Sequence, residues 1–150
     1  MKYLFVCLGN ICRSPVVAAT FQHEVKASRR EGDFVIDSCG IGGWHAGDMA
    51  DPRSIKMAQS YGISLEAHRA RKIRKTDFAE FDVILCMDES NLAELQQICP
   101  KEYLPKVRLL LEYALSENRP VPDPYYSGED AFRNVQELAL GAAKAMLAKV

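Results

Sequence analysis

The chain has 150 residues, of which 48% are hydrophobic and 26% are charged, and its formal net charge is −1. These values are typical of one soluble globular domain spanning residues 1–150, and they exclude a disordered or low-complexity chain. A net charge near zero argues against a nucleic-acid-binding protein, and no apolar run approaches the ~18 residues that a membrane span requires.

The five cysteines are an odd number and show no regular spacing, so we expect no disulfide scaffold. The chain begins directly with a strand of core type, so we expect no secretory signal. Free thiols persist in reducing compartments. We therefore expect a cytoplasmic location.

The first predicted elements are a strand and a helix joined by a tight loop. Lys2–Val6 is an apolar, β-favouring run of strand length. After the loop, apolar residues recur at helical spacing, with Ser14 as the predicted N-cap and Pro15 at the first helical position. This arrangement aims loop N–H groups and the positive end of a helix dipole at one point. It predicts an anion-binding cradle.

The loop carries a candidate nucleophile and a candidate phosphate ligand. Its eight residues are Cys7, Leu8, Gly9, Asn10, Ile11, Cys12, Arg13 and Ser14. Oriented amides and a nearby cation would favour the thiolate form of Cys7, and the planar guanidinium of Arg13 can hold two phosphate oxygens. Together they predict nucleophilic attack on phosphorus. A zinc site at Cys7 and Cys12 would need a second close Cys/His pair, and a nucleotide-binding loop would end in Gly-Lys-Ser/Thr.

Strands alternate with helices along the rest of the chain. The predicted strands are 33–38, 81–87 and 106–110, and the predicted helices are 51–62, 88–99 and 128–150. Such alternation indicates βαβ units and a parallel sheet. We therefore predict a single-domain, flavodoxin-like α/β fold with a four-stranded parallel sheet in the order 2-1-3-4, helices on both faces, and the Cys7 loop at the switch point.

Three connecting segments carry other candidate residues. The glycine-rich loop 39–47 contains Trp44, which could either pack on the core or form a wall of a substrate pocket. The basic segment Arg69–Lys75 could be a solvated face. In the segment Val121–Gly128, two prolines flank Asp123 and would hold its carboxyl group in a defined direction.

The pattern Cys-x5-Arg-Ser is the signature loop of protein tyrosine phosphatases. Because this loop follows an N-terminal strand and an Asp-Pro-Tyr-Tyr segment begins at Asp123, the chain resembles the low-molecular-weight family. The resemblance implies two-step hydrolysis of phosphotyrosine through a phosphocysteine on Cys7. Arg13 would hold the phosphate oxygens and Asp123 would act as general acid and then general base. It implies no metal and no other cofactor.

The resemblance also implies the residues that hold the substrate. Ser14 would hydrogen-bond to the thiolate, Asn10 would brace the loop in a left-handed conformation, and His68 would support the loop. An aliphatic residue at Ile11 favours phosphotyrosine, whereas a threonine there would favour phosphoarginine. The predicted substrate-binding residues are Leu8, Gly9, Asn10, Ile11, Cys12, Ser14, Trp44, Tyr125 and Tyr126.

Two other functions are compatible with a loop that binds phosphate-like anions. An arsenate reductase of the same fold would relay a disulfide through two further cysteines a few residues apart, and Cys39, Cys86 and Cys99 offer no such pair. A non-catalytic phosphotyrosine-binding module would be expected to lack Cys7, Arg13 or Asp123. We expect a phosphotyrosine-containing protein, for example a tyrosine kinase, as partner, no nucleic acid and no membrane, and a monomer or weak dimer.

The sequence does not decide the roles of two local features, the segment 38–41 and Cys12. The segment Ser38-Cys39-Gly40-Ile41 departs from the Ser-Ala-Gly-Thr that the family would have there. Cys12 lies five positions from Cys7 on the same loop, so loop curvature could bring the two sulfurs within disulfide reach. Cys12 is therefore either a redox partner of Cys7 or a small packed residue.

Overall fold

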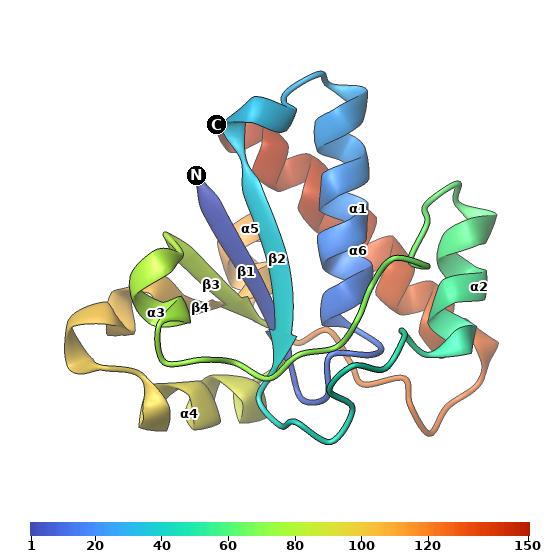
Figure 1. Ribbon diagram of the computed structural model, residues 1–150. Coiled ribbons are helices and arrows are strands. Elements are labelled where there is room, and N and C mark those ends of the chain that lie inside the picture. The colour runs from blue at the N-terminus through green and yellow to red at the C-terminus, as the bar shows by residue number, and fades with distance from the viewer.

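Strand β1 (Lys2–Cys7) lies inside a four-stranded parallel sheet (Figure 1). Its neighbours are β2 (Val35–Gly40) and β3 (Val83–Cys86), and β4 (Val107–Leu109) pairs with the far side of β3. The structure is a computed structural model that describes residues 1–150. The observed order β2-β1-β3-β4 confirms the predicted order 2-1-3-4.

Side chains of β1 alternate between two buried faces. Tyr3 and Phe5 point into the larger core, whereas Leu4 and Val6 belong to a second core on the opposite face. Successive side chains of a strand point to opposite sides, and a strand covered on both faces is apolar throughout. This is why the run Lys2–Val6 lacks the apolar–polar alternation of a half-exposed strand.

Helices cover both faces of the sheet, as predicted (Figure 1). The larger core is covered by α1 (Ser14–Ala27), α5 (Leu110–Leu115) and α6 (Glu129–Lys149). The opposite face is covered by α3 (Asp77–Glu80) and α4 (Glu89–Ile98). Helix α2 (Pro52–Ser60) packs against α6 at the edge of the larger core. No helix is both long and apolar enough to span a bilayer.

Several predicted boundaries are wrong for local reasons. Ser14 does not cap α1; Arg13 holds the N-cap position without a side-chain bond, because the Ser14 hydroxyl is engaged inside the loop. Strand β2 begins at Val35 rather than at residue 33, since Glu31–Asp33 forms a 3₁₀ turn. The short helices α3 and α5 were not predicted.

The Cys7–Ser14 loop lies where the carboxyl ends of β1 and β2 meet. Gly40, the last residue of β2, makes this contact possible: a Cβ there would lie 3.0 Å from the backbone carbon of Gly9 and from the oxygen of Leu8. Only glycine allows such a close approach of two backbones. The loop thus occupies the end of the sheet at which open α/β folds bind ligands.

Candidate active site

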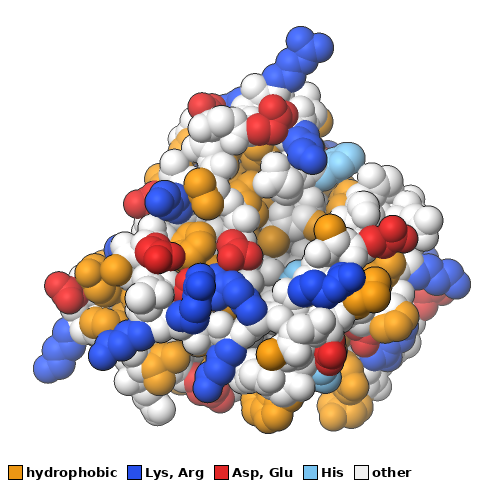
Figure 2. All heavy atoms as spheres, viewed as in Figure 1, with side chains coloured by type: hydrophobic (Ala, Val, Ile, Leu, Met, Phe, Trp, Pro, Cys, Tyr) orange, Lys and Arg blue, Asp and Glu red, His pale blue; other side chains and the backbone are white.

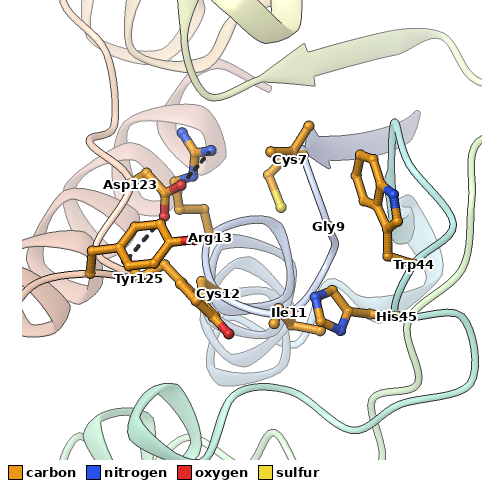
Figure 3. A pocket seen from close by; sticks show the side chains of 11 residues that line it. Cys7, Gly9, Ile11, Cys12, Arg13, Trp44, His45, Asp123 and Tyr125 are labelled. Carbon is orange, nitrogen blue, oxygen red and sulfur yellow. Dashed lines mark hydrogen bonds and ion pairs between the residues drawn. The ribbon is translucent and has the colours of Figure 1, made fainter.

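The Cys7–Ser14 loop forms the floor of a cavity of about 220 Å³ (Figure 3). The cavity is lined by Cys7, Leu8, Gly9, Ile11, Cys12, Arg13, Trp44, His45, Asp123, Tyr125 and Tyr126. The fold therefore brings together the three predicted catalytic residues from two distant segments. It also gathers every predicted substrate-binding residue except Asn10 and Ser14. These two loop residues are fully buried and do not line the cavity.

The sulfur of Cys7 points into this cavity (Figure 3). It accepts a hydrogen bond from the backbone N–H of Asn10 at 3.3 Å and lies 3.0 Å from the hydroxyl oxygen of Ser14. Apart from that of Asn10, the backbone N–H groups of Leu8–Arg13 donate to no acceptor within the protein. The loop therefore offers unpaired donors around the sulfur, as an anion cradle requires.

Asn10 braces the loop from behind. Its φ of 61° is left-handed, as expected for this residue, and asparagine tolerates it better than most. Its side-chain nitrogen donates to the hydroxyls of Ser14 (2.8 Å) and Ser38 (3.0 Å), and its side-chain oxygen accepts from the backbone of Arg71 (3.0 Å). The Ser14 oxygen accepts from Asn10, and its own proton has two acceptors within reach, the Cys7 sulfur at 3.0 Å and the Cys39 carbonyl oxygen at 3.4 Å. A thiolate at Cys7 is the nearer and the charged acceptor, so it attracts that proton.

His68 supports the same residue through the backbone. Its Nε2 lies 2.8 Å from the carbonyl oxygen of Asn10, and since a carbonyl can only accept, the Nε2 atom carries the proton. Burial lowers the pKa of His68, and the hydrogen bond to Asn10 opposes this effect. The side chain therefore acts at neutral pH as an uncharged donor that holds the loop backbone.

Arg13 is buried and held by an acidic partner that the sequence did not reveal. Its Nη1 donates to Oδ2 of Asp88 at 2.6 Å and to the carbonyl oxygen of Val121 at 3.1 Å. Its Nη2 lies 3.8 Å from Oδ2 of Asp123. From the sequence, Asp88 is only the start of a predicted helix; its position two residues after β3, at the carboxyl edge of the sheet, is the available signal.

Asp123 lies on the wall opposite Trp44, with the Cys7 sulfur between them (Figure 3). Its Oδ1 accepts from the backbone N–H of Tyr125 at 3.1 Å, which is a local Asx turn. The loop is anchored by Val121, whose N–H donates to the Met87 carbonyl at 2.8 Å. The carboxyl group is partly exposed, so it can contact both a bound ligand and water.

Trp44 forms a wall of the cavity and is not packed in the core. It is 71% exposed, and its ring lies so close to Gly42 that a Cβ on that glycine would overlap it. Tyr125 lines the opposite side, whereas Tyr126 is 94% exposed and stands at the mouth rather than deep in the slot. His45 was not predicted; it lines the cavity beside Gly9 and pairs with Asp48 at 3.2 Å.

Cys12 lines the cavity but directs its thiol toward Asp51, at 3.8 Å. Burial and, to a smaller extent, the charge on Asp51 raise the pKa of Cys12 to about 12. Arg53 forms an ion pair with Asp51 at 2.8 Å and donates to the carbonyl oxygen of Tyr125 at 2.9 Å. Asp51 and Arg53 thus connect the Cys7–Ser14 loop with the wall that carries Asp123.

The other three cysteines lie away from the cavity. Cys39, Cys86 and Cys99 are all buried in the core on the α4 side of the sheet, and burial raises the pKa of each thiol. Ile41 packs against the same core. The two residues at which the segment 38–41 departs from the family pattern, Cys39 and Ile41, therefore both contact this core. No group of three or more His, Cys, Asp or Glu side chains is placed to hold a metal ion.

Comparisons with known proteins agree with this geometry. The family model "Low molecular weight phosphotyrosine protein phosphatase" matches residues 2–150. Proteins of that name from Schizosaccharomyces pombe and Sus scrofa are 46% and 42% identical, over 88% and 98% of this chain and 85% and 94% of theirs. A protein tyrosine phosphatase from Entamoeba histolytica, crystallised with Hepes in its active site, superimposes with a TM-score of 0.93 at 35% identity, covering 99% of this chain and 96% of that one.

Proposed function

Because this chain belongs to the low molecular weight phosphotyrosine protein phosphatase family, we propose that it hydrolyses phosphotyrosine in proteins and also small aryl phosphates. The observation that carries the proposal is the shared cavity of Cys7, Arg13 and Asp123. It combines a nucleophile, an anion cradle and a carboxyl group, which are the three parts that thiolate-based phosphate-ester hydrolysis needs. Every part is supplied by the protein's own side chains and backbone.

In the first step, the thiolate of Cys7 attacks phosphorus in line with the leaving oxygen. The unpaired N–H groups of the loop and the Arg13 guanidinium bind the three equatorial oxygens and stabilise the charge that develops on them. Asp123, in its protonated form, donates its proton to the departing phenolate oxygen. The phosphorus–oxygen bond breaks, a phosphorus–sulfur bond forms, and phosphocysteine results.

In the second step, water hydrolyses the phosphocysteine. Asp123, now a carboxylate, takes a proton from the attacking water, and phosphate leaves. The Ser14 hydroxyl, at 3.0 Å from the sulfur, stabilises the thiolate as it departs. The partial exposure of Asp123 supports this exchange of roles, since water must reach the carboxylate.

The shape of the cavity supports an aryl leaving group. Trp44 and Tyr125 face each other across the Cys7 sulfur (Figure 3), and aromatic walls stabilise a phenyl ring by stacking and area burial. A phosphoserine is shorter, so its phosphorus would stay short of a thiolate on the floor. Ile11 presents no hydroxyl group, which supports phosphotyrosine rather than phosphoarginine. We expect a cytoplasmic phosphoprotein, such as a tyrosine kinase, as substrate, and a monomer or weak dimer.

The other activities considered from the sequence gain no support. An arsenate reductase would need a pair of accessible relay cysteines, whereas Cys39, Cys86 and Cys99 are buried in the core. A purely binding module would have no use for a carboxyl group like that of Asp123, which lies at the cavity and is anchored within 3.8 Å of Arg13.

The proposal is tested by replacing the nucleophile and the phosphate ligand separately. Cys7→Ser is expected to abolish hydrolysis of p-nitrophenyl phosphate and of a phosphotyrosine peptide while inorganic phosphate still binds, because the cradle survives. Arg13→Lys is expected to weaken both phosphate binding and turnover, since a point charge cannot replace a bidentate fork. Near-normal hydrolysis by Cys7→Ser would contradict the proposal, and phosphate binding by a catalytically silent wild type would favour a binding module.

A further inference from the structure

The segment Arg69–Lys75 carries five basic residues whose charges the proposed reaction does not use. Two of the five are neutralised within the fold: Arg71 pairs with Asp37 at 3.0 Å and with Asp77 at 2.9 Å, and Arg74 pairs with Asp77 at 3.2 Å. Burial would raise the pKa of Asp77, but hydrogen bonds and charge from Arg71 and Arg74 lower it below its usual value. These pairs are structural.

The remaining three cations have no carboxylate partner. Arg69 donates only to the backbone carbonyls of Glu66 and His68, and the ammonium groups of Lys72 and Lys75 form no hydrogen bond or ion pair at all. All three side chains are exposed. We refer to Arg69, Lys72 and Lys75 as the basic surface. Figure 2 shows Lys and Arg side chains gathered where, in Figure 1, the chain between α2 and α3 crosses the end of β2.

The basic segment packs against the loop that carries Trp44. The backbone N–H of Gly47 donates to the carbonyl of Ala70, and that of Ala70 donates to the carbonyl of Asp48, both at 2.8 Å. The side chain of Lys72 lies along Gly43, whose Cβ position is 3.5 Å from the lysine Cδ. The loop that supports Trp44 and His45 is therefore bonded directly to the basic segment.

From this geometry we infer that the basic surface binds acidic residues flanking the phosphotyrosine of a substrate protein. The inference rests on the proposed function, because the phosphotyrosine side chain must first anchor the peptide in the cavity. Lys72 lies along Gly43, the residue before Trp44. A peptide that leaves the cavity over Trp44 therefore runs toward the basic segment.

The expected contribution is one of selectivity. Ion pairs between exposed groups are individually weak, but three unpartnered cations on one short segment create a local positive potential that favours an acidic peptide over a neutral one. This potential is screened by salt, with a Debye length of ~8 Å at physiological ionic strength and ~3 Å at 1 M. A preference that arises here must therefore fade as salt is added.

The experiment compares two phosphotyrosine peptides on the same enzyme. One carries Asp and Glu on both sides of the phosphotyrosine, and the other carries Asn and Gln at those positions, so shape is kept and charge removed. The readout is the ratio of kcat/KM for the acidic peptide to that for the amide peptide. Because each enzyme is compared with itself, a change in overall turnover cancels from this ratio.

The test variant is Lys72→Glu/Lys75→Glu, which avoids the structural arginines. The matched control is Lys26→Glu/Lys144→Glu, which changes net charge equally at two exposed lysines outside the cavity. Lys26 lies 12 residues beyond Ser14 on α1, which is about 18 Å along the helix axis. Wild type and control should prefer the acidic peptide by about three- to tenfold, the test variant should lose or invert that preference, and ~1 M salt should abolish it.

The outcomes separate the inference from the proposed function. If p-nitrophenyl phosphate and both peptides are hydrolysed and the test variant keeps the wild-type ratio, the inference is overturned while the phosphatase assignment stands. The same holds if control and test variants lose the preference equally, since net charge alone would then explain it. If wild type hydrolyses none of the three substrates, both statements fall. Binding of wild type and test variant to anionic vesicles is measured in parallel. If the test variant loses vesicle binding but keeps the wild-type peptide preference, the basic surface contacts a membrane and the inference is wrong.

Discussion

The two carboxylate oxygens of Asp88 serve two different partners, and one of them is Arg13. Oδ1 accepts from the backbone N–H of Asn91 and so caps α4, whereas Oδ2 accepts from Arg13 Nη1 at 2.6 Å. The Arg13 side chain is 4% exposed and the Asp88 side chain 25%. A single side chain at the end of β3 thus ties the phosphate ligand to the rigid part of the fold.

This arrangement predicts that Asp88→Ser impairs catalysis more than it impairs folding. Serine preserves a good helix cap but leaves Arg13 without its charged anchor. We expect kcat/KM for an aryl phosphate to fall by about 10²-fold, since a misplaced catalytic group is that costly. The loss in the free energy of unfolding should be smaller in proportion, because Arg13 keeps the Val121 carbonyl oxygen and the nearby Asp123 as partners. Steady-state kinetics and urea denaturation of the same preparation measure the two effects. If the loss of activity is no larger than the loss of folded protein accounts for, the Asp88–Arg13 pair serves folding alone.

Asp123→Asn is predicted to make the rate depend strongly on the leaving group. Asparagine can still accept the Tyr125 N–H bond at Oδ1, so the loop keeps its shape, but it cannot donate an acidic proton. Removal of a general acid typically costs about 10²- to 10⁴-fold. We expect a loss of that size for phenyl phosphate and a much smaller one for p-nitrophenyl phosphate, whose phenolate departs without a proton. An equal loss on both esters would exclude Asp123 as the general acid.

His68 is predicted to make stability depend on pH. Its folded-state pKa lies below its ordinary value because of burial. Between the folded pKa and the unfolded value of ~6.5, the unfolded chain therefore binds more protons than the native one. Stability is then fully present above the unfolded pKa and is lost as pH falls toward the folded pKa.

The matched variant is His68→Gln, whose amide can still donate to the Asn10 carbonyl but does not titrate. Urea denaturation from about pH 7.5 to about pH 5.5, a range that brackets the ordinary histidine pKa, measures the free energy of unfolding of both proteins. The wild type should lose more stability over this range than the variant, by at most about 1.4 kcal/mol per pH unit for one proton. Parallel curves would mean that His68 does not titrate differently in the two states.

The parts of the site that lie on one continuous stretch were predictable. Cys7 and Arg13 share a loop, so their spacing and the strand and helix around them indicate the chemistry without any tertiary information. Asp123 was found through its flanking prolines together with the resemblance. The alternation of strands and helices predicts a parallel sheet, and the order 2-1-3-4 is that of a flavodoxin-like fold. In these cases local pattern and global fold point to the same structure.

The residues that were missed or misjudged depend on contacts between distant segments. Asp88 and Ser38 meet the loop only after the sheet forms, and neither carries a local signature of that role. Serine is a residue type that favours the N-cap position, but the Ser14 hydroxyl is hydrogen-bonded to Asn10 and Cys7 instead. Hydrogen bonding within the loop therefore overrides the local preference. Helix α5 spans only Leu110–Leu115, which is too short for a 3.6-residue period to be visible.

The last prediction concerns Cys12 and oxidation of the nucleophile. Cys12 lines the same cavity as Cys7, and its pKa of about 12, raised first by burial and then by Asp51, keeps it a protonated thiol. Hydrogen peroxide should oxidise the Cys7 thiolate first, giving a sulfenic acid and hydroxide. The Cys12 sulfur can then attack that sulfenic acid, forming a disulfide and releasing water, with the thiol proton transferred to the leaving hydroxyl. The neighbouring Asp51 carboxylate, at 3.8 Å from the thiol, is placed to assist this transfer.

Capture by Cys12 would protect Cys7 from irreversible oxidation. Wild type treated with peroxide and then with a thiol reductant should therefore recover most of its activity, whereas Cys12→Ser should recover much less. Cys99→Ser is the matched control, because Cys99 is a free cysteine outside the cavity and its loss should not alter recovery. Peptide mass spectrometry of the oxidised wild type should contain a Cys7–Cys12 cross-link. Equal recovery by all three proteins, or absence of that cross-link, would leave Cys12 as a packed residue in contact with Met57 and Phe132.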